Sequence, residues 1–297
     1  MICMIRVVDY ENGEWKEPCI LLLGYFDGMH VGHRKLLERA KCLAREKNCT
    51  VGLMTFYDGK SGGQIYLFEE RLYLFEKLGA NFVYAAHFND AFRATDGVSF
   101  LAHILSALNV KAFVCGADFT FGKGAACGTP ELQNFCREHK IESVVCPLVA
   151  LRGEKAAASL AKRYLREGET EKLAELLGAR YFIRGRVSTE GRQVGRKMGF
   201  PTANIHLPPE KYPLKSGVYA VTAEIDGAQY RGIANYGPRP TFEDGRIVFE
   251  VYLDGFTGDL YGQTITVYFD FYIRDIRKFA SAEALANQLK IDLEKIR

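Results

Sequence analysis

The sequence lacks any long apolar run and any concentrated block of basic residues. No segment of the 297 residues approaches the roughly 18 apolar residues that a membrane-spanning helix needs. The 39 lysines and arginines against 36 acidic residues leave a net charge of only +3, without the basic stretch typical of nucleic-acid-binding proteins. The first residues also lack the parts of a secretory signal. We therefore expect a soluble, cytoplasmic protein that binds neither membranes nor nucleic acids; the sequence does not indicate its oligomeric state.

Paired cysteines are also missing. The eight cysteines lie between Cys3 and Cys146, contain no CxxC pair, and in several cases fall inside apolar runs such as residues 112–115. This spacing does not match a metal site or a disulfide framework. We expect reduced, buried thiols.

The length is sufficient for two domains, and the first half alternates short apolar runs with segments of helical spacing. Strands are expected at residues 19–24, 49–56, 81–88 and 111–115, and helices at residues 33–47, 68–78 and 98–108. This alternation predicts an α/β domain with a Rossmann-like parallel sheet covered by helices. Its ligands should bind beyond the carboxyl ends of the strands.

From residue 180 onward, alternating β-type residues replace the α/β pattern. Strands are expected at residues 181–187, 218–225, 230–234, 247–253 and 264–271, with Asp226-Gly227 as a hairpin turn and Ser281 as the N-cap of a last helix. The pattern predicts a small antiparallel β-barrel or sandwich with a terminal helix. We expect domains at residues 1–153 and 180–297, joined by a helical connector at residues 154–179.

A glycine-rich segment with two histidines, GYFDGMHVGH, occupies residues 24–33, where the first expected strand gives way to the first helix. Gly24, Gly28 and Gly32 allow the backbone to approach a ligand closely, and a helix N-terminus attracts phosphate. His30 and His33 can donate to phosphoryl oxygens and stabilise a transition state. The spacing alone would favour two histidines without a role, but the strand-turn-helix context favours a phosphate site.

This segment resembles the HxGH-type signature of the nucleotidyltransferase superfamily. The longer string GYFDGMHVGHRKLL resembles the version found in bacterial bifunctional riboflavin kinase/FAD synthetases. A second string, GADFTFGKG at residues 116–124, resembles the GxDFxFG segment of that family. The resemblance implies an adenylyltransferase, or FAD synthetase, domain. Its implied nucleotide-binding residues are Gly24, Phe26, Asp27, Gly28 and Gly32, its catalytic residues His30 and His33, and its flavin-binding residues Asp118, Phe119 and Phe121.

Two segments depart from the family pattern. After the second expected strand the chain reads TFYDGK at residues 55–60, where the family has a Pro-His-Pro-like turn. Before the connector, residues 156–158 are alanines, followed by Ser159 and Lys162, where the family has Ile-Ser-Ser-Thr-x-x-Arg. Lysine lacks the bidentate fork with which arginine holds phosphate. A second hypothesis therefore keeps the kinase and makes the adenylyltransferase weak or inactive.

A second glycine-punctuated loop, GRVSTEGRQVGRKMGFPTAN, occupies residues 185–204. Its glycines permit a tight loop over phosphates, the Thr202 hydroxyl can ligate a hard cation, and the Asn204 carbonyl oxygen can bind a metal or a nucleotide. The same residue types also mark plain turns. The string resembles the riboflavin kinase signature GxxxGRxxGFPTAN. The resemblance implies a site for ATP with Mg²⁺. Its implied nucleotide-binding residues are Gly191, Gly195, Arg196, Gly199, Thr202 and Asn204. Of these, Thr202 and Asn204 are also the implied metal ligands.

Two further residues complete the implied kinase site. Glu250, in the string FEVYL at residues 249–253, is the general base that the resemblance implies, although its spacing alone would favour a solvent-facing strand residue. Arg274 is implied to contact ADP or flavin. The whole resemblance, from about residue 21 to 292, implies that riboflavin and ATP give FMN, and that FMN and ATP give FAD and pyrophosphate. A third hypothesis, a flavin-nucleotide-binding regulator without turnover, is disfavoured because a binder needs no base.

Overall fold

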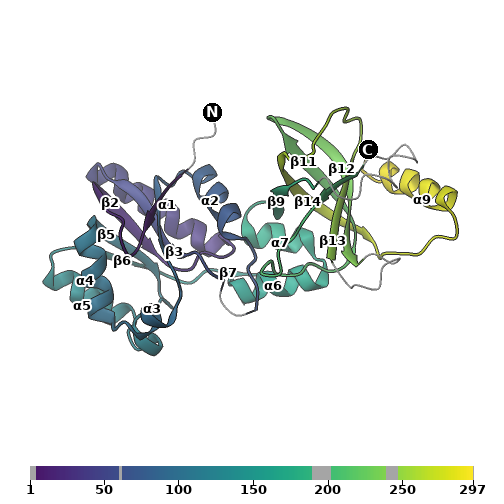
Figure 1. Ribbon diagram of the computed structural model, residues 1–297. Coiled ribbons are helices and arrows are strands. Elements are labelled where there is room, and N and C mark those ends of the chain that lie inside the picture. Colours follow the sequence, from purple (N-terminus) through teal and green to yellow (C-terminus); the bar gives the residue numbers. More distant parts are fainter. Residues whose placement is uncertain (1–4, 60–61, 189–201, 239–246, 297) are drawn as a thin grey trace. The chain divides into compact units, whose positions relative to one another are not determined.

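The computed structural model describes residues 5–59, 62–188, 202–238 and 247–296 of the chain. The chain folds into two compact units, Met1–Ala158 and Ser159–Arg297 (Figure 1). In the part of the chain that is described, no helix is long and apolar enough to cross a membrane.

The N-terminal unit is built on a parallel sheet with the strand order β1-β4-β3-β2-β5-β6. Its strands are β1 (Arg6–Asp9), β2 (Trp15–Leu23), β3 (Thr50–Phe56), β4 (Phe82–Ala86), β5 (Leu108–Gly116) and β6 (Glu142–Cys146). Its helices are α1 (Val31–Lys47), α2 (Phe68–Lys77), α3 (Asp90–Ala94), α4 (Gly97–Ala107), the short 3-10 helix at Lys123–Ala125 and α5 (Thr129–Glu138), followed by the hairpin of β7 (Ala150–Leu151) and β8 (Glu154–Lys155). The chain leaves β2 toward β3 on one side and later enters β5 on the other. A topological switch point therefore lies between β2 and β5, and such points are where ligands of parallel sheets bind.

The predicted α/β order of this unit is confirmed, because the apolar pattern is what the core uses. Helix α1 buries residues that recur at helical spacing, namely Leu36, Leu37, Ala40, Leu43 and Ala44. The last five residues of β2 are all buried, as expected of a central strand covered on both faces. Trp15, the only tryptophan of the chain, stacks on Phe82 with ring centroids 4.2 Å apart.

The C-terminal unit is built on an antiparallel sheet with the strand order β10-β13-β12-β11-β14-β9. Its strands are β9 (Phe182–Arg186), β10 (Thr202–Ile205), β11 (Gly217–Ile225), β12 (Ala228–Pro238), β13 (Ile247–Leu253) and β14 (Thr264–Arg274). The edge strands β9 and β10 also meet. Val187 pairs with Ile205 in an isolated antiparallel bridge, and the Ser188 N–H donates to the Asn204 carbonyl at 2.7 Å. The sheet therefore curls back on itself, as the predicted small barrel requires.

The turn between β11 and β12 is the predicted two-residue hairpin. Asp226 and Gly227 both have positive φ, 50° and 83°, and Ile225 pairs directly with Ala228. Two left-handed residues in this position form the turn type whose twist matches that of the strands, and Asp-Gly is a preferred pair for it.

Helix α9 (Ala282–Glu294) begins at the predicted N-cap, because the Ser281 hydroxyl accepts from the Ala284 N–H at 3.2 Å. Leu293 of this helix packs with Val218 and Ile233 of the sheet. The fully buried carboxylate of Asp292 accepts from the Arg274 guanidinium at 2.8 Å and 2.7 Å. This ion pair fastens α9 to the end of β14.

The segment expected as a connector holds α6 (Ala158–Glu167) and α7 (Thr170–Leu177). The boundary between the two units falls after Ala158. The domain boundaries expected from the sequence stay a prediction.

The seven described cysteines are all free thiols. Cys19, Cys115 and Cys136 are buried, and burial raises their pKa values to about 12, 12 and 11. The other four are half-buried. The expectation of buried, reduced thiols is thus confirmed for three of them.

Candidate functional site

The loop between β2 and α1, residues 24–30, adopts a strained backbone at the switch point of the parallel sheet. Phe26 and Met29 have φ values of 54° and 43°, a left-handed conformation that costs about 1–3 kcal/mol for a bulky residue. Both side chains are buried, so the surrounding core holds the strained backbone in place. Strain of this kind persists only where the neighbouring structure fixes it, and it clusters at functional sites. Because the sequence predicts a phosphate site here, we call this segment the phosphate loop.

The glycines of the phosphate loop have a structural reason besides close approach of a ligand. A Cβ added at Gly24 would lie 2.8 Å from the ring of Phe26, and one at Gly32 would lie 3.0 Å from Nδ1 of His30. A side chain at position 24 would therefore overlap the buried Phe26 ring, and one at position 32 would crowd the His30 imidazole. Gly28, the third predicted glycine, lies buried between them.

The two histidines meet at the start of α1. His30 is the N-cap of the helix, and its Nδ1 accepts from the His33 N–H at 3.4 Å. The two imidazole rings stack with centroids 3.7 Å apart, and the Phe26 ring packs edge-on against His33. Because Nδ1 of His30 accepts, its ring proton lies on Nε2, which can donate to a ligand oxygen.

Both imidazoles are neutral at pH 7. Burial lowers the pKa of His30 to about 4, with Asp118 opposing this shift and Lys155 adding to it. Burial and then the neighbouring His30 lower the pKa of His33 well below its ordinary value. In the described part of the chain, Nδ1 of His33 is buried without a hydrogen-bond partner. The pair thus supplies hydrogen-bond donors but no positive charge.

Acid should therefore weaken the N-terminal unit. A histidine of the unfolded chain has a pKa of about 6.5, so between this value and about 4 the unfolded state binds protons that His30 in the folded unit does not. The contribution of neutral His30 to the free energy of unfolding is fully present above about pH 6.5. It is lost as the pH falls toward 4, which lowers the unfolding free energy by about 3 kcal/mol. Urea unfolding followed by Trp15 fluorescence measures this loss.

The variant His30→Asn serves as the control for this measurement, because asparagine caps a helix but does not titrate. Its unfolding free energy should fall less between about pH 7 and about pH 4.5 than that of the wild type. Equal losses in both proteins would contradict the assignment.

Asp27, predicted to bind the nucleotide, has a structural task in the phosphate loop. Its carboxylate is 3% exposed and accepts from the backbone N–H groups of Ile65 at 2.9 Å and Tyr66 at 3.4 Å. It thereby ties the loop to the segment that precedes α2. Its predicted contact with the nucleotide stays a prediction.

Asp118 and Lys155 bring two further segments to the phosphate loop. Asp118 follows β5, and its carboxylate pairs with the ammonium of Lys155, at the end of β8, at 2.5 Å. Both charges act on the pKa of His30, which the Asp118 carboxylate raises and the Lys155 ammonium lowers. Val149 lies next to Gly32 and accepts from the Ala156 N–H at 2.8 Å. Lys155 is a functional candidate that the sequence reasoning missed, since no motif marks it.

The two phenylalanines predicted to bind flavin lie at different depths. Phe121 is 7% exposed and packs against Phe100 of the core with ring centroids 5.8 Å apart. Phe119 is half-buried and stacks on Phe121 at 5.5 Å. Of the three residues predicted to bind flavin, Asp118 and Phe119 are therefore more accessible to a ligand than Phe121.

The turn after β3 carries no histidine of its own, but a histidine from the next strand lies beside it. His87, which follows β4, has its Nδ1 3.0 Å from the Asp58 carboxylate. The Tyr25 hydroxyl of the phosphate loop donates to the Asp58 carbonyl at 3.3 Å. An imidazole is therefore present at this edge of the sheet although the turn lacks the family's Pro-His-Pro pattern.

In the C-terminal unit, strand pairing gathers the predicted kinase residues on one face of the sheet. Glu250 of β13 lies directly opposite Asn204 of β10 on one side and Asn235 of β12 on the other. Thr202 lies opposite Tyr252, two residues along the same strands. Side chains of directly opposed residues share a face and have Cβ atoms about 4.5–5.5 Å apart.

These polar residues are half-buried, whereas the residues between them, Ala203, Ala234, Phe249 and Val251, are buried on the other face. Asn235 extends the predicted set, and the sequence analysis did not single it out. A row of hydroxyl, carboxamide and carboxylate oxygens on one face is the donor set that a hard cation such as Mg²⁺ prefers.

Several other predicted residues are not brought into this row or cannot be placed. Gly191, Gly195, Arg196 and Gly199 lie outside the described residues. The guanidinium of Arg274 is engaged by Asp292, and its predicted contact with ADP or flavin stays a prediction.

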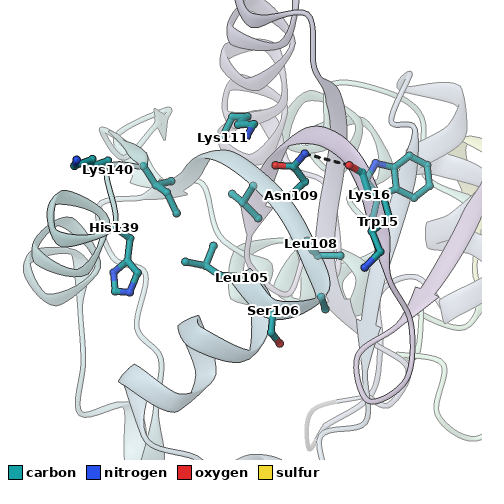
Figure 2. Close-up of a pocket in the computed structure, with 12 residues that line it drawn as sticks. Trp15, Lys16, Leu105, Ser106, Leu108, Asn109, Lys111, His139 and Lys140 are labelled. Carbon is teal, nitrogen blue, oxygen red and sulfur yellow. Dashed lines mark hydrogen bonds between the residues drawn. The ribbon is translucent and has the colours of Figure 1, made fainter.

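A hollow of about 560 Å³ lies at the amino ends of strands β2 and β5, on the side of the sheet opposite to the phosphate loop (Figure 2). The first residues of β2 and β5 and the ends of α4 and α5 line it, and Figure 2 shows Lys16, Lys111 and Lys140 around it. Ligands of parallel sheets bind at the carboxyl ends of the strands, and no predicted site residue lines this hollow. It is therefore not the candidate site.

Comparisons with known proteins cover both units. The family model for FAD synthetase matches residues 13–160, and that for riboflavin kinase matches residues 177–297. A Bacillus subtilis protein named bifunctional riboflavin kinase/FMN adenylyltransferase is 34% identical over 294 residues, which cover 95% of this chain and 92% of the relative. The protein of the same name from Escherichia coli K12 is 32% identical, over 97% of this chain and 95% of the relative. A crystal structure titled as a macrolide-efflux protein from Streptococcus pneumoniae matches with a TM-score of 0.85 and 30% identity, over 99% of both chains.

Proposed function

The chain belongs to the family of bifunctional riboflavin kinase/FMN adenylyltransferases, and from this premise we propose how its two units divide the work. The C-terminal unit transfers the terminal phosphoryl group of ATP to riboflavin and releases FMN. The N-terminal unit transfers the adenylyl group of a second ATP to FMN and releases FAD and pyrophosphate. The observation that carries this division is the convergence of Asn204, Glu250 and Asn235 in one unit and of His30, His33 and Lys155 around the phosphate loop of the other.

In the kinase unit, Glu250 accepts the proton of the riboflavin 5′-hydroxyl as that oxygen attacks the terminal phosphorus of ATP. Asn204 and Asn235 lie on either side of Glu250. Their side chains orient the oxygens of the substrates next to the reacting hydroxyl. The Thr202 hydroxyl and the Asn204 carboxamide oxygen would hold Mg²⁺, which neutralises charge on the ATP phosphates when bound.

In the adenylyltransferase unit, the attacking group is a phosphate oxygen of FMN, which is largely deprotonated at pH 7. No general base is therefore needed, and neutral imidazoles suit the task. His30 donates from Nε2 to the reacting phosphate, and the strained loop fixes its position. Because both histidines lack charge, the ammonium of Lys155, which acts on the pKa of His30, supplies positive charge to this site.

Lys155→Met should raise the KM for ATP in FAD formation about fivefold, because a partly exposed cation contributes at most about 1 kcal/mol of binding energy. Lys155→Arg, which keeps the charge, should change it less than about threefold. Lys47→Met is the matched control, since Lys47 is an exposed lysine of the same unit that pairs with Glu142 at 2.9 Å. An unchanged KM for Lys155→Met would remove this residue from the site.

A second candidate function has its own observation. The ammonium of Lys162, which stands where the family has arginine, lies over the Tyr212 ring at 4.9 Å, and Ser159 is exposed. With alanines at residues 156–158, this segment offers the triphosphate few donors. A chain that makes FMN readily and FAD slowly would fit this observation.

The deciding experiment separates the flavins by chromatography after the purified protein has been incubated with ATP and Mg²⁺ and with either riboflavin or FMN. We expect riboflavin to be converted through FMN to FAD, and added FMN to be converted to FAD. FMN that accumulates without FAD would establish the second candidate. Riboflavin that stays unchanged would overturn the proposed function of the kinase unit.

A further inference from the structure

An arginine of α2 lies fully buried directly behind the phosphate loop. Arg71 has no exposed surface and is one of the largest fully buried side chains of the described chain. Its Nη1 donates to the Thr55 hydroxyl at 2.5 Å and lies 3.5 Å from the Tyr25 carbonyl. Its Nη2 donates to the Phe56 carbonyl at 2.8 Å and to the Gln64 side-chain oxygen at 3.1 Å. One guanidinium thus contacts the phosphate loop, the end of β3 and the segment before α2.

Burial of the Arg71 guanidinium carries a considerable desolvation cost. Arginine is almost never fully buried unless other groups compensate it, and burial lowers its pKa, while Tyr25, Asp27 and Glu70 oppose that shift. The guanidinium also lies over the Tyr25 ring at 5.1 Å and the Phe68 ring at 5.5 Å. An apolar side chain of similar volume is often as stable as a buried ion, so stability alone gives little reason for arginine here.

Two contacts of Arg71, one direct and one through Thr55, converge on the Tyr25 carbonyl of the phosphate loop. The Thr55 hydroxyl, which accepts from Arg71, donates to the Tyr25 carbonyl at 2.6 Å. Tyr25 directly precedes Phe26, whose backbone is left-handed. Asp27, the next residue, is tied to Ile65 and Tyr66. The left-handed residue Phe26 is therefore held on both sides, by Arg71 through the Tyr25 carbonyl and by the contacts of Asp27.

We propose that Arg71 is a positioning residue for adenylyl transfer: its buried guanidinium sets the backbone of the phosphate loop and thereby the placement of His30 and His33. This inference rests on the proposed FAD-forming activity of the N-terminal unit. Arg71 does not touch the substrates. Its effect should reach the reaction through the loop, where a displacement of about 1 Å can reduce the rate about a hundredfold.

The test compares two variants. Arg71→Met keeps roughly the volume of the side chain but removes the guanidinium and its hydrogen bonds, whereas Arg71→Lys keeps the positive charge. We expect the kcat of FAD formation from FMN to fall about a hundredfold in Arg71→Met and about tenfold in Arg71→Lys. The KM for ATP should change less than about threefold, because the loop geometry matters most in the transition state. FMN formation from riboflavin by the same protein should stay unchanged.

Two controls separate positioning from folding. Arg45→Met makes the same exchange at an exposed site on α1 and should not change FAD formation. Trp15, which stacks on Phe82 in the core of this unit, reports by its fluorescence whether the unit is folded at the assay temperature. If Arg71→Met is not folded by this measure, the folded Arg71→Lys variant decides the question by its kcat.

The inference would be overturned if a folded Arg71 variant formed FAD within about twofold of the wild-type kcat, or if its loss lay in KM alone. A wild-type protein that forms no FAD would instead refute the activity on which the inference rests. The two failures are distinguishable because the second is seen in the wild type.

Discussion

Glu250→Gln lowers the rate of FMN formation about a thousandfold and leaves FAD formation from added FMN unchanged. A positioned general base contributes about 10²–10⁴ to a rate, and glutamine keeps the size and hydrogen bonding of the side chain but cannot take the proton. Binding of riboflavin should persist, because the neighbouring asparagines and the sheet register are unaltered. Steady-state rates with riboflavin, and separately with FMN, measure both halves of the prediction.

The matched control for this experiment is Glu224→Gln. Glu224 is a half-buried glutamate of β11 in the same unit, where it accepts from the Tyr268 hydroxyl at 3.2 Å, away from the Asn204–Glu250–Asn235 row. It should keep its kinase rate within about twofold. Undiminished FMN formation in Glu250→Gln would exclude Glu250 as the base.

His30→Asn should have the converse effect, with FAD formation reduced about 10²–10³-fold and FMN formation unchanged. Removal of one fixed donor to a developing charge costs about this factor. Asparagine is among the best N-cap residues, so α1 should keep its start while the imidazole is lost. Because the pKa of His30 is lowered to about 4, the rate of FAD formation should also show no titration of this group near pH 6.5.

His139→Asn is the control for this exchange. His139 is the C-cap of α5 and lines the hollow at the far edge of the sheet, so its loss should leave both rates unchanged (Figure 2). Equal FAD formation by His30→Asn and wild type would show that the histidine pair has no part in the reaction.

Much of the fold follows from local pattern. The sequence analysis nevertheless missed several elements, among them α5, which buries Leu132, Phe135 and Cys136 at helical spacing, and the short strands β1 and β10. Apolar runs predict the central strands, and apolar residues at helical spacing predict α1. β1 has only four residues, and β10 coincides with the Pro-Thr-Ala-Asn string that reads as a turn. Both are short strands whose pairing partners lie far along the chain, so tertiary context decides their conformation.

The candidate site residues could be predicted where a local motif contains them. They could not be predicted where residues far apart in the sequence are brought together only by folding. His30 and His33 lie where the glycine-rich segment indicated. The row of Asn204, Glu250 and Asn235 depends on the register between three strands, which no local spacing encodes.

Lys155 and Arg71 had no signal in the sequence. The partner of Lys155, Asp118, lies 37 residues away, and Arg71 reads as one more position on an amphipathic helix. Their roles arise from burial and charge in the folded unit.

The pairing of β9 with β14 has a consequence for synthesis on the ribosome. β9 is made first in its sheet, yet its partners in the sheet, residues 264–268, are the last strand to emerge. The N-terminal unit, complete by residue 158, can fold while the rest is still being translated. Until β14 emerges, β9 lacks its ladder with that strand and has only its contact with β10 at residues 187–188. The C-terminal unit therefore acquires its structure after the N-terminal one, and a slow or stalled ribosome exposes β9 to aggregation.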